Sequence, residues 1–142
     1  MTTDIEKAKK LLADGSYTCV LCKGDTVRTS SLHGIRPLLG WIHEETDYHG
    51  FAAADQIVGK AAAFLYIRLG ISALHANVLS ERGKELLEKA QIPFTYDELT
   101  PEIQNRRGDG MCPMEATVLH ITGLDEAVEA LDRKVKELAG GK

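Results

Sequence analysis

Residues 53–69 form the most apolar stretch of the chain, and this stretch restricts the available folds more than any other feature. Its apolar side chains are not confined to one side of a helical wheel, and Gly70 follows as a helix stop signal. A helix that is hydrophobic nearly all round must be enclosed by other elements. We therefore predict a central helix over residues 53–69 and a domain built around it.

The rest of the chain alternates between helical and strand patterns. Before the central stretch, apolar spacing and turn residues predict a helix over 5–13, strands over 17–23 and 26–31, and a short helix from Pro37 to about Glu45. After it, they predict a strand over 71–79, a helix capped by Ser80 that runs to about residue 90, and a strand over 92–96. A helix or short strand over 112–121 and a closing helix over 125–138 complete the chain. Gly24 and Asp25 predict a hairpin between the first two strands. This order predicts an α/β domain of three layers, in which the hairpin opens a mixed sheet with helices on both faces. No linker or repeat divides residues 1–142, so we expect one domain.

The charge balance and the start of the chain exclude several classes of protein. Lys and Arg number 17 against 21 Asp and Glu, which gives a net charge of −4, and the basic residues are scattered. This pattern gives no electrostatic footprint for duplex nucleic acid. No apolar run reaches the about 18 residues of a membrane span, and the first residues lack a signal-peptide pattern. We expect a cytoplasmic protein without membrane contact, and the oligomeric state stays open, a homo-oligomer included.

Three cysteines are an odd number, which argues against a disulfide framework and fits a reducing compartment. Cys19 and Cys22 have the spacing of a metal or redox pair, but they lie within a β-prone apolar run. Residues three apart on a strand point to opposite faces of a sheet. We therefore interpret both as small buried apolar residues, and we expect neither a metal nor a cofactor.

Two charged residues interrupt the central apolar stretch and are the first candidates for a functional site. Asp55 stands near the predicted start of the helix, and Lys60 follows five residues later. In a purely structural interpretation, Asp55 is an N-terminal acid favoured by the helix dipole, and Lys60 extends its amine from the margin of a buried helix. In a functional interpretation, Asp55 moves protons and Lys60 holds an anionic ligand.

The second candidate segment covers residues 108–115 and contains a predicted helix start. If Pro113 is the first helical residue, Cys112 is the N-cap, and the Glu115 carboxylate can reach back to the Cys112 N–H as in a capping box. A helix N-terminus also favours a thiolate, so Cys112 is at the same time a candidate nucleophile. In the loop before it, Arg106 and Arg107 bring positive charge, and the glycines beside Asp109 let the backbone approach a ligand closely.

Four segments of the chain resemble the family called domain of unknown function 1893. They are residues 34–39 (GIRPLL), 54–63 (ADQIVGKAAA), 105–106 (NR) and 112–115 (CPME). The resemblance spans nearly the whole chain and implies a fold similar to that of cytidine deaminases. It implies no reaction, because none is established for the family and a fold alone does not assign one.

Zinc deaminases begin one helix with His-x-Glu and another with Pro-Cys-x-x-Cys, which supply three metal ligands and a glutamate acid/base. By order of elements, Ala53 takes the place of the histidine and Asp55 that of the glutamate. Cys112 and Glu115 take the places of the two cysteines. Alanine cannot bind metal, so the resemblance implies a deaminase-like pocket without stoichiometric zinc.

The resemblance brings these candidates together. We predict that Asp55, Lys60, Arg106, Cys112 and Glu115 line one pocket, with Asp109 close to it. The protein is then either a binding or regulatory module for an anionic or nucleotide-like small molecule, or an enzyme with Cys112 as a thiolate nucleophile and Asp55 or Glu115 as acid/base. No histidine can be assigned as a base for the thiol, which favours the binding module.

Overall fold

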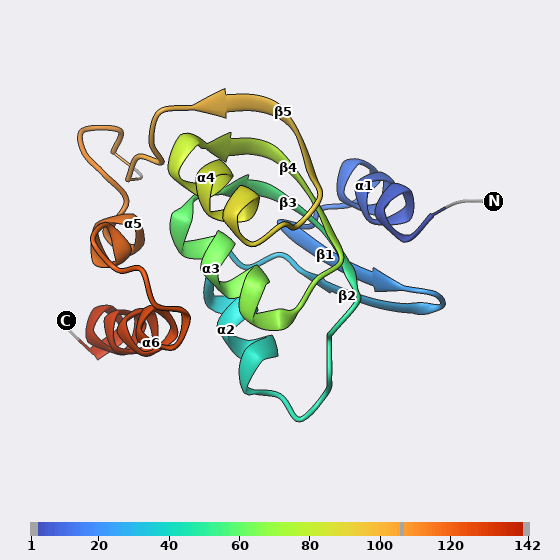
Figure 1. The fold of residues 1–142 in the computed structure, drawn as a ribbon, viewed down its shortest axis with the longest axis horizontal. Coiled ribbons are helices and arrows are strands. Elements are labelled where there is room, and N and C mark those ends of the chain that lie inside the picture. The colour runs from blue at the N-terminus through green and yellow to red at the C-terminus, as the bar shows by residue number, and fades with distance from the viewer. Residues whose placement is uncertain (1–2, 106, 141–142) are drawn as a thin grey trace.

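The computed structural model describes residues 3–105 and 107–140, which form a five-stranded sheet with helices on both faces (Figure 1). The helices are α1 (Asp4–Asp14), α2 (Arg36–His43), α3 (Lys60–Leu69), α4 (Glu81–Lys89), α5 (Pro113–Val118) and α6 (Leu124–Gly140). The strands are β1 (Cys19–Lys23), β2 (Thr26–Ser30), β3 (Ala52–Val58), β4 (Ala73–Ser80) and β5 (Phe94–Thr100). Figure 1 shows α1 on one face of the sheet and α2, α3 and α4 on the other. The three-layer α/β domain predicted from the sequence is confirmed.

The sheet is mixed, with the strand order β2-β1-β3-β4-β5. The hairpin strand β1 runs antiparallel to both of its neighbours, whereas β3, β4 and β5 run parallel to one another. The C-terminal ends of the three parallel strands therefore lie at the same edge, and Figure 1 shows them pointing toward the end of the molecule that holds α5. Ligands of open α/β sheets bind in crevices at this kind of edge.

The helix predicted over residues 53–69 is wrong in its first part. Residues up to Val58 belong to β3, the middle strand of the sheet, and the helix begins only at Lys60 after Gly59 as N-cap. A strand buried on both faces shows the same continuous apolar run as a buried helix, so periodicity could not separate the two. The predicted central position of the segment is nevertheless right, and Asp55 lies on a strand.

The other elements differ from the prediction mainly in their boundaries. β5 begins two residues later than expected and continues to Thr100, and it forms an edge of the sheet as Pro93 indicated. Residues 113–118 form a helix, and Ser80 caps α4 by accepting a hydrogen bond from the Gly83 N–H at 3.0 Å. Within the described residues, no helix is long and apolar enough to cross a bilayer.

Alternate residues of β1 supply the two apolar cores of the domain. Cys19 and Leu21 belong to the larger core, together with residues of α2, α3 and α6. Val20 and Cys22 belong to the smaller core, together with residues of α1. The two cysteines thus face opposite sides of the sheet and are both buried, as the sequence predicted.

Candidate functional site

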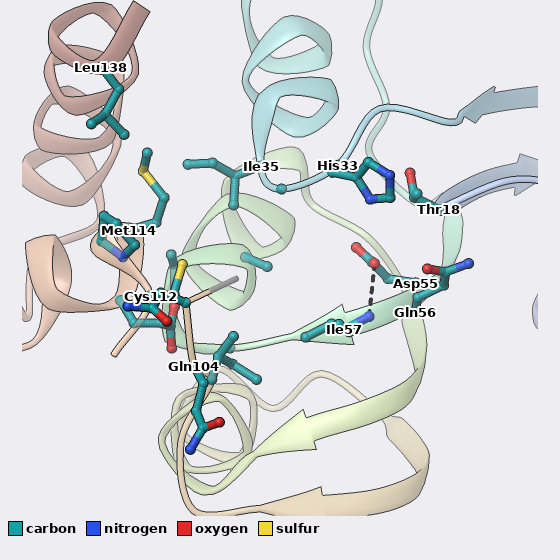
Figure 2. Close-up of a pocket in the computed structure, with 18 of the residues that line it drawn as sticks. Thr18, His33, Ile35, Asp55, Gln56, Ile57, Gln104, Cys112, Met114 and Leu138 are labelled. Atoms are coloured by element: carbon teal, nitrogen blue, oxygen red, sulfur yellow. Dashed lines mark hydrogen bonds between the residues drawn. The ribbon is translucent and has the colours of Figure 1, made fainter. Parts of the chain in front are cut away.

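A cavity of about 660 Å³ opens beyond the end of β3, next to the first residues of α3 and α5 (Figure 2). Its polar and reactive lining residues are Thr18, His33, Asp55, Gln56, Gln104, Asn105, Arg107, Cys112 and Glu115. Its apolar lining residues include Ile35, Ile57, Ala61, Ala62, Ile103, Pro113, Met114 and Leu138. The cavity has the size and the mixed lining of a small-molecule site. Three of the five residues predicted to share one pocket therefore line this cavity.

Asp55 reaches the cavity from β3 and is only 8% exposed as a residue. Its Oδ2 accepts a hydrogen bond from the Tyr66 hydroxyl at 2.7 Å, and its Oδ1 accepts one from the backbone N–H of Ile57 at 3.2 Å. Burial raises the pKa of Asp55 to about 7, and the bonds from Tyr66 and Ile57 offset only part of that rise. Asp55 can therefore gain or lose a proton near neutral pH.

Two further titratable groups lie behind Asp55 in the protein interior. Cys19 is the register partner of Asp55 across the β1–β3 ladder. Burial raises the pKa of the Cys19 thiol to about 12, and the Asp55 charge adds to this rise. Burial also raises the pKa of Tyr66, again with a contribution from Asp55. Both groups are therefore neutral at physiological pH, and Asp55 is the member of this cluster that titrates.

Glu115 lines the cavity from α5, but its carboxylate binds the start of α3. Oε1 accepts a hydrogen bond from the Lys60 N–H and Oε2 accepts one from the Ala61 N–H, both at 2.8 Å. The N-cap residue of α3 is Gly59, which has no side chain to do this. A β-carbon on Gly59 would overlap the Glu115 carboxylate. Burial raises the pKa of Glu115, and the two backbone bonds act against the rise.

Cys112 is the N-cap residue of α5 with Pro113 after it, as predicted. The predicted capping box is wrong, because the Cys112 N–H donates to the carbonyl oxygen of Ile103 at 2.9 Å while Glu115 caps the other helix. The Cys112 side chain is half-buried and lines the cavity. Figure 2 shows it on the side of the pocket away from His33 and Asp55.

The predicted ligand-binding residues have other surroundings. The Lys60 ammonium donates to the carbonyl oxygen of Leu119 at 3.1 Å and lies 5.7 Å from the centre of the Phe64 ring. Burial lowers the pKa of Lys60. Asp109 accepts a hydrogen bond from the side chain of Asn105 at 2.9 Å, which closes the loop on itself. Neither Lys60 nor Asp109 is among the residues that line the cavity.

Arg106, the remaining predicted member, lies outside the described residues. Its neighbour Arg107 lines the cavity, as do His33 and Gln104, which the sequence analysis did not select. His33 and Gln104 come from loops and have no motif spacing that would have revealed them. The sequence feature that could have indicated His33 is its place directly before residues 34–39, one of the segments that carry the family resemblance.

The residues that occupy the deaminase motif positions do not fit a zinc ion. Ala53 and Asp55 lie on β3, so the predicted match to a helix-opening His-x-Glu is wrong. Both carboxylate oxygens of Glu115 accept hydrogen bonds from backbone N–H groups. Of the two residues matched to the Pro-Cys-x-x-Cys motif, Cys112 is therefore the one that could bind a metal ion. Among the described residues, no group of three or more His, Cys, Asp or Glu side chains is arranged to hold a metal ion.

Comparisons with known proteins give the family and the fold. No protein with a curated description matches the chain. The crystal structure of a DUF1893 family protein from Thermotoga maritima, solved at 2.70 Å, superimposes with a TM-score of 0.85 at 25% sequence identity. The match covers 92% of this chain and 89% of the other chain. The family profile described as "Domain of unknown function (DUF1893)" matches residues 7–135. The chain therefore belongs to the DUF1893 family.

Proposed function

We propose that this protein is a binding or regulatory module for a small organic molecule, which it holds in the cavity at the end of β3. The observation that carries the proposal is the cavity itself, because segments that are distant in the sequence bring a buried carboxyl group, amide side chains and an apolar wall together in it. Its volume of about 660 Å³ suits a ligand of nucleoside size. Its position at the carboxyl ends of parallel strands is where α/β sheets commonly bind ligands.

The geometry supports a polar ring compound more than a phosphate. The N–H groups at the start of α3 would be an anion site, but Glu115 already fills them. Asp55 would repel a second negative charge nearby. The sequence led us to expect an anionic or a nucleotide-like ligand, and the pocket agrees better with the nucleotide-like class. Within that class, the base and the sugar suit the pocket better than the phosphate does. The proposed similarity to deaminases, which bind nucleosides, is consistent with this choice.

The alternative function is an enzyme with Cys112 as a thiolate nucleophile. A nucleophilic thiol needs a base within hydrogen-bonding reach. Glu115 has both oxygens engaged by α3, and Figure 2 shows His33 and Asp55 on the other side of the pocket. We therefore favour the binding role, in which Cys112 is part of the wall.

Two tryptophan variants test the proposal. Ile57 is half exposed and lines the cavity, so Ile57→Trp should fill part of it without disturbing the core. Leu99→Trp is the matched control, because Leu99 is a partly exposed residue of β5 that does not line this cavity. Native mass spectrometry of purified protein, followed by a thermal-shift screen of nucleosides and nucleotides, measures binding. We expect binding to wild type and Leu99→Trp and weak binding to Ile57→Trp. The proposal fails if no compound binds wild type, or if both variants bind equally.

A further inference from the structure

The Asp55 carboxyl group is buried at the wall of the cavity. The residue is 8% exposed, and in the described part of the chain no Lys or Arg forms an ion pair with it. Its hydrogen-bond donors, Tyr66 and Ile57, are both neutral. A buried carboxylate is costly unless a positive charge and good hydrogen bonds accompany it. A cation from outside the protein could reach Asp55 through the cavity that it lines.

The hydrogen bonds that Asp55 accepts also indicate which chemical group could bind it. A carboxylate offers about four acceptor positions, two on each oxygen. Tyr66 uses one position on Oδ2 and Ile57 uses one on Oδ1, so one position remains on each oxygen. Two acceptor positions on one carboxylate can accept the paired N–H groups of a planar amidinium or guanidinium. Figure 2 shows the carboxyl group directed off β3 toward the part of the pocket where His33 and Thr18 lie.

The remainder of the cavity accommodates a body attached to that cation. Ile35, Ile103 and Met114 contribute apolar surface, and 660 Å³ is far more space than an amidinium group alone requires. The other charged lining groups are compatible with a cation beside Asp55. Glu115 has both carboxylate oxygens bonded to backbone N–H groups of α3, and Figure 2 shows Cys112, the N-cap of α5, on the opposite side of the pocket.

We propose that the cavity binds a planar organic cation, and that Asp55 holds its amidinium or guanidinium group through two parallel hydrogen bonds. This inference rests on the proposed binding function and narrows it to a class of ligand. It keeps the polar ring compound proposed above and gives it a positive charge, whereas the sequence had led us to expect an anionic or nucleotide-like ligand. Arg107 also lines the cavity, so the cationic end of the ligand lies at Asp55 and its polar or apolar body extends toward Ile103 and Gln104.

Three probes with the same ring test the inference. Benzamidine is a planar cation, benzamide is its neutral analogue and benzoate is its anionic analogue. Titrations followed by ¹H–¹⁵N NMR, up to about 10 mM probe, give Kd values even for weak binding. At about pH 8 we expect benzamidine to bind about tenfold more tightly than benzamide, and benzoate to bind most weakly. In Asp55→Asn, which keeps the shape and can still bond Tyr66, the preference for benzamidine should disappear.

The dependence on pH gives a second test that leaves Asp55 intact. The Asp55 pKa of about 7 means that the carboxylate form increases from about pH 6 to about pH 8, so benzamidine affinity should rise over this range. The titratable groups that face Asp55 or share its cavity are Cys19 and Tyr66, which stay neutral here, and His33, Arg107, Cys112 and Glu115. A protonated His33 would also repel a cation at low pH, so the rise must persist in His33→Gln.

The outcomes separate this inference from the proposed function. If the three probes bind equally, or if Asp55→Asn retains the preference, the cation inference is wrong. If the affinity for all three probes is nevertheless lower in Ile57→Trp than in wild type, the proposed binding function of the cavity is still supported. A pH dependence that vanishes in His33→Gln also overturns the role of Asp55. If none of the probes binds wild type, the cation inference is overturned, and the screen described above decides the binding function.

Discussion

Glu115 in α5 caps α3 by accepting a hydrogen bond at 2.8 Å from the backbone N–H of Ala61, a residue 54 positions earlier in the chain. The same carboxylate accepts a second bond at 2.8 Å from the neighbouring N–H of Lys60. A helix start normally finds its cap in the residue just before it, but that residue here is Gly59. The cap therefore links two segments that both line the cavity, and it fixes α5 relative to the start of α3.

We expect Glu115→Ala to destabilise the protein by about 2–4 kcal/mol, because it leaves two N–H groups of α3 without partners, one of them buried. Glu115→Gln should cost about 1 kcal/mol, since its amide oxygen can still accept a bond. Urea denaturation measures both. The control is Glu88→Ala at an exposed position of α4, which should change stability by less than about 0.5 kcal/mol. Equal stabilities for Glu115→Ala and the control would show that the cap contributes nothing.

Gly59→Ala should also destabilise the protein, because its β-carbon would overlap the Glu115 carboxylate and push it off α3. Gly40→Ala is the control, since a β-carbon at Gly40 in α2 meets no other atom within 4 Å. The control should be neutral or more stable by up to about 1 kcal/mol, as expected for alanine in a helix. Thermal denaturation followed by circular dichroism compares the two.

A double variant identifies the contact responsible. In the Glu115→Ala background the carboxylate is gone, so adding Gly59→Ala should cost at least about 1 kcal/mol less than it does in wild type. Strictly additive effects would mean that Gly59 is needed for another reason.

Much of the fold could be predicted from the sequence because local signals were strong there. The hairpin turn at Gly24, the cap at Ser80 and the Pro113 helix start each depend on neighbouring residues alone. β3 could not be recognised, because its apolar residues face two layers of helices and therefore show no alternation. Gly59 marked the junction between strand and helix, but a lone glycine inside an apolar run is ambiguous.

The site was predicted in part for a related reason. Asp55, Cys112 and Glu115 were predicted to share one pocket from the fold that the family resemblance implied, and all three line the cavity. Their detailed roles depend on contacts between distant segments, which a single sequence does not reveal. Lys60 was expected to bind a ligand, but it donates to the Leu119 carbonyl instead. His33 joins the cavity from a loop that no sequence pattern distinguished.

The raised pKa of Asp55 predicts how stability varies with pH. Its pKa rises from 3.8 to about 7 on folding, so between these values the folded state binds more protons than the unfolded state. The contribution of Asp55 to the free energy of unfolding is therefore fully present below about pH 4 and is lost as the pH rises through about 7. Asp55→Asn cannot lose a proton, so its stability relative to wild type should increase over this range, by a few kcal/mol at most.

Urea denaturation of both proteins at intervals from about pH 4 to about pH 8 measures this difference. Asp14→Asn, at an exposed position at the end of α1, is the control and should show little trend. A difference between wild type and Asp55→Asn that stays constant with pH would contradict the protonation assigned to Asp55.

Cys112 should be the first of the three thiols to react with an alkylating reagent in the native protein. Cys19 and Cys22 are buried in β1, and burial raises the pKa of both, to about 12 for Cys19. Few thiolates are therefore present at these positions near neutral pH, and the reagent reaches them only when the domain opens. Cys112 is half-buried at the wall of an open cavity, so it can react without unfolding.

Peptide mapping after brief exposure to iodoacetamide at neutral pH identifies the modified residue. We expect carbamidomethylation at Cys112 alone in wild type, and almost no label in Cys112→Ser until urea unfolds the chain. Ile57→Trp gives a further control, because a side chain that fills the cavity should slow the reaction of Cys112 while Leu99→Trp leaves its rate unchanged. Early labelling of Cys19 or Cys22 in the folded protein would mean that β1 is more accessible than its burial between two layers of helices allows.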